Sequence, residues 1–257
     1  MRPNFFLRLL ELADTHEPLV FDARHVFVFF SREQEQVDRL WNMVVQRLSF
    51  DMTNPVMTVR LHLLALLLTS DRIQPKLPWP TLPHIARNLV TAMEQAPPHK
   101  DETETVWLSS ALLSLCGIVS ASEWSEGYAA VPGDATERTA FLDEMRPMLL
   151  TLMLRILEYS SQLSDGSLLG LARMLVLLTR DPRTAASMVE QRALPLVLRP
   201  LLTRRRFQRA SYQRLVIIVL RHMVESGGSL LPLLTNELHV WMLSLIHISE
   251  PTRPERI

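Results

Sequence analysis

The sequence predicts an all-α protein. Leu, Met, Arg, Glu and Gln dominate it, and these residues are strong helix formers. Gly is scarce at 7 of 257 residues, and the apolar/polar alternation of a half-buried strand is rare. Hydrophobic residues make up 47% and charged residues 21%, which is ordinary for a folded chain and excludes wholesale disorder. A chain of this length can bury a sizeable core as one domain or two.

Four helices are expected in the first 70 residues, at residues 4–13, 19–30, 34–49 and 56–68. The aromatic and β-branched side chains of residues 19–30 also fit a strand. We predict a helix there because the run Asp22-Ala23-Arg24-His25 breaks any two-residue alternation. Asn54-Pro55 gives the fourth helix a capping side chain and an early proline, whose missing N–H costs little at that position.

Three more helices are expected in the middle of the chain, at residues 82–93, 104–120 and 141–160. Residues 71–83 hold four prolines and are predicted to form a connector. Residues 124–140 are the least regular part, and we predict a loop there. Trp79 and Trp124 lie in these two stretches, where each either anchors its loop to the core or contacts a partner.

Residues 167–225 show the clearest pattern of helices and breaks. Apolar residues recur at helical spacing up to Leu178, Asp181-Pro182 stops the run, and shorter helices are expected at residues 183–191 and 194–202. An arginine-rich loop then leads into a last helix with an apolar face, which Gly227-Gly228 ends. This order is typical of armadillo and HEAT units, so we predict an armadillo/HEAT-like α-solenoid of about ten helices.

The chain divides into three parts in this interpretation. Residues 1–160 form an N-terminal helical solenoid segment, and residues 161–242 form a C-terminal armadillo-like helical segment. Residues 243–257 form a disordered, non-native tail, because residues 243–254 read LSLIHISEPTRP and resemble the translation of a sequencing-library adapter. We therefore expect natural coding sequence to end near Met242.

No catalytic, cofactor-binding or metal-ligating residue is predicted. The single cysteine, Cys116, lies mid-helix among apolar neighbours, without a base or helix N-terminus that would lower the pKa of its thiol. We expect a buried structural thiol. The histidines are scattered, and no two of them lie at i,i+4 on one helix with a Glu between them, as the zinc-protease motif HExxH requires. GxGxxG, GxxxxGK[ST] and GxSxG motifs are absent from the sequence.

Charge and hydropathy limit which partners and which cellular compartment we expect for the protein. The formal net charge is zero, so no overall field attracts nucleic acid or a membrane. Apolar runs stay far below the ~18–20 residues needed to span a bilayer. One cysteine excludes a disulfide framework and fits a reducing compartment. We expect an intracellular protein without a membrane partner, in the cytoplasm, the nucleus or both.

One region is dense in charge, and we name its members the arginine patch: Arg204, Arg205, Arg206, Arg209 and Arg214. Such a patch could contact an acidic protein segment, bind the phosphates of single-stranded nucleic acid, or belong to a nuclear localisation signal. The interpretation that we favour is a solvated loop between helices. The neutral net charge argues against nucleic acid.

Three blocks of the chain, residues 4–48, 57–68 and 166–225, carry a family resemblance. In order and spacing they resemble the mid-region of the giant HECT-type E3 ubiquitin ligases that contain UBA and, in some members, WWE domains. The third block carries most of it, because LARMLVLLTRDPRTAASMV and LVIIVLRHMVE resemble the family's helix ending in Leu-Thr-Arg-Asp and its later Leu-Leu-Arg-His-hydrophobic-Glu helix. Residues 124–140 leave too little room for a WWE domain.

The resemblance implies a non-catalytic helical scaffold fragment of such a ligase, which would position substrates in protein ubiquitination. The family transfers ubiquitin through a cysteine of its C-terminal HECT domain, and Cys116 matches no HECT motif. Expected partners are protein substrates or the rest of the ligase solenoid. The alternative hypothesis is a free-standing HEAT/armadillo protein-interaction adaptor.

Overall fold

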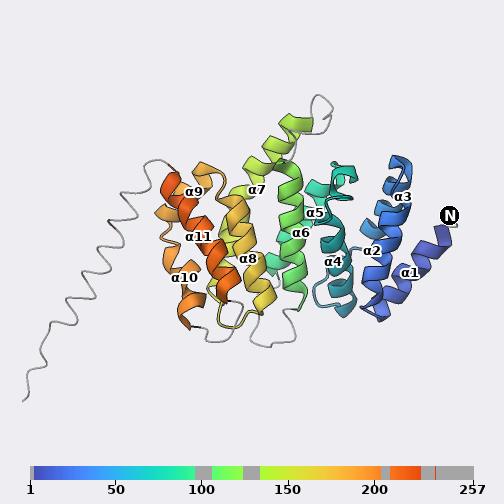
Figure 1. Cartoon of the computed structure of the whole chain (residues 1–257), viewed down its shortest axis with the longest axis horizontal. Helices are drawn as coiled ribbons and strands as arrows, with labels where there is room; N and C mark the ends of the chain where they lie inside the picture. The colour runs from blue at the N-terminus through green and yellow to red at the C-terminus, as the bar shows by residue number, and fades with distance from the viewer. Residues whose placement is uncertain (1–2, 96–105, 124–133, 204–208, 227–234, 236–257) are drawn as a thin grey trace, which may run out of the picture.

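The computed structural model describes residues 3–95, 106–123, 134–203, 209–226 and 235, and within them regular structure is entirely helical. The predicted all-α class is confirmed (Figure 1). The elements in chain order are α1 (Pro3–Thr15), α2 (Leu19–Phe30), α3 (Gln34–Val45), α4 (Pro55–Leu68), the 3-10 helix η1 (Gln74–Lys76), α5 (Thr81–Gln95), α6 (Val106–Glu123), α7 (Asp134–Leu157), α8 (Asp165–Leu178), α9 (Pro182–Glu190), α10 (Leu194–Thr203) and α11 (Arg209–Glu225).

The helices form an elongated row in which helices near one another in the chain pack together (Figure 1). One layer runs α2, α4, α6, α8 and α11, each packed on the next. A second layer contains α5 and α7, which pack on each other and on α6, and α7 also packs on α8, α9 and α10. The main contacts among the described helices join elements at most three positions apart in the chain.

Capping side chains fix where several helices begin. The Asn54 side-chain oxygen accepts a hydrogen bond from the Val56 N–H at 3.0 Å, with Pro55 at the first position of α4, as predicted. The Asp181 carboxylate likewise accepts from the Thr184 N–H at 2.9 Å. Asp181-Pro182 therefore separates α8 from α9 and also provides the cap and first residue of α9.

The ambiguous stretch at residues 19–30 is helical, with the predicted bounds. Val20, Ala23 and Phe27 are buried at the i, i+3, i+7 spacing of one helix face. The predicted helix at residues 34–49 is too long, because α3 ends at Val45. Arg47 and Leu48 continue with N–H bonds to the carbonyls three residues back, which is a tighter turn, and Phe50 then takes a φ of 55°.

The predicted loop at residues 124–140 is wrong for residues 134–140, which form the first turns of α7. Residues 124–133, with Trp124, lie outside the described residues. Most side chains of residues 136–140 are exposed, and these turns extend beyond the row in Figure 1. A helix end without a buried face carries no apolar periodicity, so the pattern gave no sign of it. Pro147 lies inside α7.

Large side chains tie the layers together. The Trp41 indole N–H donates to Thr81 Oγ1 at 2.8 Å, and the Tyr212 hydroxyl donates to the Val197 carbonyl at 2.9 Å. Trp79 is buried and packs edge-on against Phe141, with ring centroids 5.6 Å apart. The expectation that Trp79 anchors the connector to the core is confirmed.

Two further predictions fall on parts of the chain that are not described. Gly227-Gly228 and the tail at residues 243–257 lie outside the described residues. The division at residues 160 and 242 stays a prediction. Among the described residues no helix is both long and apolar enough to cross a membrane.

Candidate functional site

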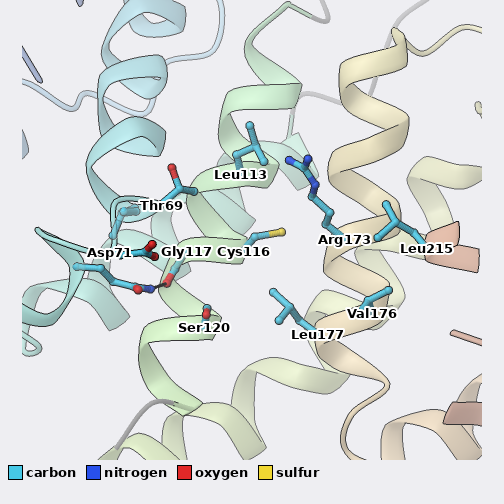
Figure 2. Close-up of a pocket in the computed structure, with 12 residues that line it drawn as sticks. Thr69, Asp71, Leu113, Cys116, Gly117, Ser120, Arg173, Val176, Leu177 and Leu215 are labelled. Carbon is cyan, nitrogen blue, oxygen red and sulfur yellow. Dashed lines mark hydrogen bonds between the residues drawn. The ribbon is translucent and has the colours of Figure 1, made fainter. Parts of the chain in front are cut away.

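An open groove of about 330 Å³ lies where the end of α4, the connector after it, α6, α8 and α11 meet (Figure 2). We name it the α6/α8 groove. Its surface is mainly apolar and is formed by Leu68, Thr69, Asp71, Gln74, Leu113, Cys116, Gly117, Ser120, Arg173, Val176, Leu177 and Leu215.

Two glycines let the helices beneath the groove approach closely. A Cβ atom on Gly117 of α6 would lie 2.6 Å from Leu68 Cβ and 3.0 Å from the Leu68 carbonyl oxygen, so α4 occupies that space. A Cβ on Gly170 of α8 would lie 3.0 Å from Leu112 Cβ of α6. The floor of the groove is therefore three helices in close contact, and glycine is required at the first crossing.

The connector after α4 is held against the groove by one side chain. Gln74 Nε2 donates to the Gly117 carbonyl oxygen at 2.8 Å. This bond ties η1 to the middle of α6 and holds the α4 rim, where Asp71 points toward α6 in Figure 2.

The opposite rim carries the cation Arg173, exposed on α8. Its side chain reaches from α8 toward Leu113 of α6 (Figure 2). Within the part of the chain that the structure describes, Arg173 makes no hydrogen bond or ion pair. A guanidinium above apolar side chains can bind a planar anion through two parallel N–H donors.

Cys116 is buried in the groove floor, as expected for a structural thiol. Burial raises the pKa of its thiol to about 12, against a smaller lowering by Arg173. The thiol donates a hydrogen bond to the Gly170 carbonyl oxygen, with Sγ and O 3.8 Å apart. A thiol with this pKa is protonated at neutral pH and is a poor nucleophile.

A polar cluster joins three helices at another part of the row. The Glu123 carboxylate at the end of α6 lies 2.8 Å from Arg180 Nη1 and 3.7 Å from Arg146 Nη2 of α7. Partial burial acts to raise the pKa of Asp181, but two hydrogen bonds from Thr184, with the charges of Arg146 and Arg183, together outweigh it and lower the pKa. These carboxylates are bonded to arginines and helix N–H groups, which is a structural role.

Thr179 and His222 join α8 to α11. The Thr179 hydroxyl donates to the Leu175 carbonyl at 2.8 Å, so its oxygen accepts from Nδ1–H of His222 at 2.9 Å. Partial burial is the largest influence on the pKa of His222 and lowers it. The charges of Arg180 and Arg221 also lower it, while Glu225 raises it. The imidazole is therefore neutral at neutral pH with its proton on Nδ1.

No group of three or more His, Cys, Asp or Glu side chains that could hold a metal ion occurs among the described residues.

The arginine patch is only partly described. Arg204, Arg205 and Arg206 lie outside the described residues, as does the side chain of Arg209 at the start of α11. Arg214 is exposed on α11. Two other arginines of this part of the chain are engaged, because Arg199 donates to the Glu158 carbonyl at 3.2 Å and Arg221 pairs with Glu225 at 2.7 Å. The patch stays a predicted partner-binding surface.

Sequence reasoning did not single out the groove. Leu113, Val176 and Leu215 resemble ordinary core positions, and only the structure shows them half-exposed around one hollow. One signal was available: Arg173 is the charged residue within the apolar run from Ser167 to Leu178.

The chain matches no protein-family model, no curated protein and no solved structure.

Proposed function

We propose that the chain is a non-catalytic scaffold segment of a giant HECT-type E3 ubiquitin ligase, contributing an armadillo/HEAT-like solenoid. The observation that carries this proposal is the packing of the row. Its main contacts join helices close together in the chain, as expected when repeats stack in one dimension.

The family resemblance supports the same proposal from the sequence. Its first block covers α1 to α3, its second lies in α4, and its third runs from α8 to α11. The cap at Asn54 lies between the first and second blocks, and the cap at Asp181 lies within the third, between α8 and α9.

The physical role would be to hold substrate-binding modules at a set distance from a remote catalytic lobe. Protein substrates and neighbouring solenoid would be the partners, and the arginine patch would offer a contact for an acidic segment. This scaffold function would operate in the cytoplasm or nucleus. A protonated, buried Cys116 suits a scaffold, since ubiquitin transfer through a thioester needs an accessible thiolate.

The deciding experiment is recovery of the complete coding transcript. A reading frame that continues beyond Met242 into a HECT domain supports the proposal, whereas a stop codon near that point supports a free-standing adaptor. A ubiquitin-transfer assay on the purified chain adds a second readout. We expect no ubiquitin thioester, and a thioester that disappears in Cys116→Ala would contradict the scaffold role.

A further inference from the structure

We propose that the α6/α8 groove binds an extended peptide segment of a partner protein, in which an acidic side chain flanked by apolar ones pairs with Arg173. This inference goes beyond the scaffold role and does not depend on the ligase family.

The apolar part of the site comes from three helices. Leu113 of α6, Val176 and Leu177 of α8, and Leu215 of α11 are each only partly buried around the same hollow. Apolar side chains of a ligand would remove these surfaces from water, which is the main favourable contribution to association.

Charge complementarity selects the polar part of the ligand. Arg173 has no ion-pair or hydrogen-bond partner among the described residues, and its guanidinium lies beside the apolar wall (Figure 2). A carboxylate there would form charge-assisted hydrogen bonds with the guanidinium. Asp71 lies on the α4 side of the hollow, opposite Arg173, and there it can accept N–H groups of the peptide backbone (Figure 2).

The shape of the groove favours a peptide over a small molecule. Its volume of about 330 Å³ is at the low end of small-molecule sites, which span ~300–1,000 Å³ and enclose most of the ligand. This groove is open, and its lining comes from α4, α6, α8 and α11, which follow one another along the row. An extended chain, at about 3.3 Å per residue, can cross these helices and place alternate side chains in the hollow.

The test uses the full 257-residue chain and an array of fluorescent heptapeptides. The central residue is Asp, Glu, Asn, Gln or Lys, and the flanking positions vary among Leu, Phe, Val and Ser. We expect acidic centres with apolar flanks to bind about tenfold tighter than their amide counterparts, as lost charge-assisted hydrogen bonds would require. Arg173→Glu should reverse the preference toward Lys centres.

Two further variants keep the outcome interpretable. Arg155→Glu makes the same charge change at an exposed residue of α7 outside the groove lining, and its binding should equal that of the wild type. Leu113→Glu places a carboxylate beside Arg173 within the chain itself and should abolish peptide binding. Thermal melting of each variant establishes that it is folded.

Several results would overturn the proposal. These are an unchanged acidic preference in Arg173→Glu, equal losses in Arg155→Glu, or no peptide held above background. Saturable binding of octanoate without any peptide binding would make the groove a small-molecule site instead. Loss of a dimer in Arg173→Glu, seen by sedimentation, would assign the groove to a second copy of the chain.

Discussion

Replacing Gly117 by Ala tests the close crossing of α4 and α6 beneath the groove. The new Cβ would lie 2.6 Å from Leu68 Cβ and 3.0 Å from the Leu68 carbonyl oxygen. The carbonyl belongs to the α4 backbone, so a change of side-chain rotamer cannot relieve the contact. The two helices must move apart, and contacts on both sides of Gly117 must loosen with them.

The free energy of unfolding should fall by about 1–2 kcal/mol. Inserting a methyl group into a packed core typically costs about 1–3 kcal/mol, and here the clash involves backbone. Replacing glycine by alanine inside a helix returns up to about 1 kcal/mol, because alanine loses less conformational freedom. The steric cost is the larger of the two, so the net change is destabilising.

The measurement is urea unfolding followed by circular dichroism at 222 nm, with a matched series of substitutions. Gly170→Ala would place Cβ 3.0 Å from Leu112 Cβ, and Gly166→Ala would place it 3.4 Å from Ser109 Cβ, which is an ordinary contact. We expect Gly166→Ala to be neutral or stabilising and Gly170→Ala to lie between the other two. A Gly117→Ala protein as stable as the wild type would refute the reasoning about the crossing.

The other predictions concern three single side chains. Raising the pKa of Cys116 from 9.0 to about 12 lowers its thiolate fraction at pH 8 about a thousandfold. Iodoacetamide should therefore modify Cys116 only when the protein unfolds. Fast modification in native buffer would contradict the burial of the thiol. Asp181→Ala should cost about 1 kcal/mol in urea unfolding through loss of the α9 cap, with Asp181→Asn recovering most of it. Because the folded-state pKa of Asp181 is depressed, its stabilisation should be complete above about pH 4 and be lost as the pH falls through that lowered pKa. The folded-state pKa of His222 lies below 6.5, so the unfolded state binds more protons than the folded state. The free energy of unfolding should therefore fall as the pH drops below about 6.5. If His222→Gln shows the same dependence of stability on pH, another group is responsible.

The sequence predicted helices best where a buried face and a cap coincide. α2 has its predicted bounds because its buried residues recur at helical spacing, and α4 begins at Asn54-Pro55 because that pair supplies both a cap and a tolerated proline. The beginning of α7 was missed because residues 136–140 are largely exposed and helical only by continuation from the packed part. The end of α3 was misplaced because Leu48 stays buried after the helix has ended.

The groove could not be predicted because it depends on how distant segments meet. Gly117 lies against Leu68, and Gly170 lies against Leu112. The spacing of residues along the chain does not indicate either of these contacts. Burial of Cys116 could be predicted, since its neighbours on the helix are apolar. The half-exposure of Leu215 could not, because it requires knowing that α11 packs beside α8.

The row of helices also has a mechanical consequence. Because its main contacts join helices at most three positions apart, small changes of angle at successive interfaces add along the long axis. The ion pair between Arg87 and Glu144, with Nη2 and Oε2 2.7 Å apart, crosses one such interface at the surface and can re-form after a small displacement. In the solenoid that we propose, the row would therefore bend or lengthen under load while each local core stays packed.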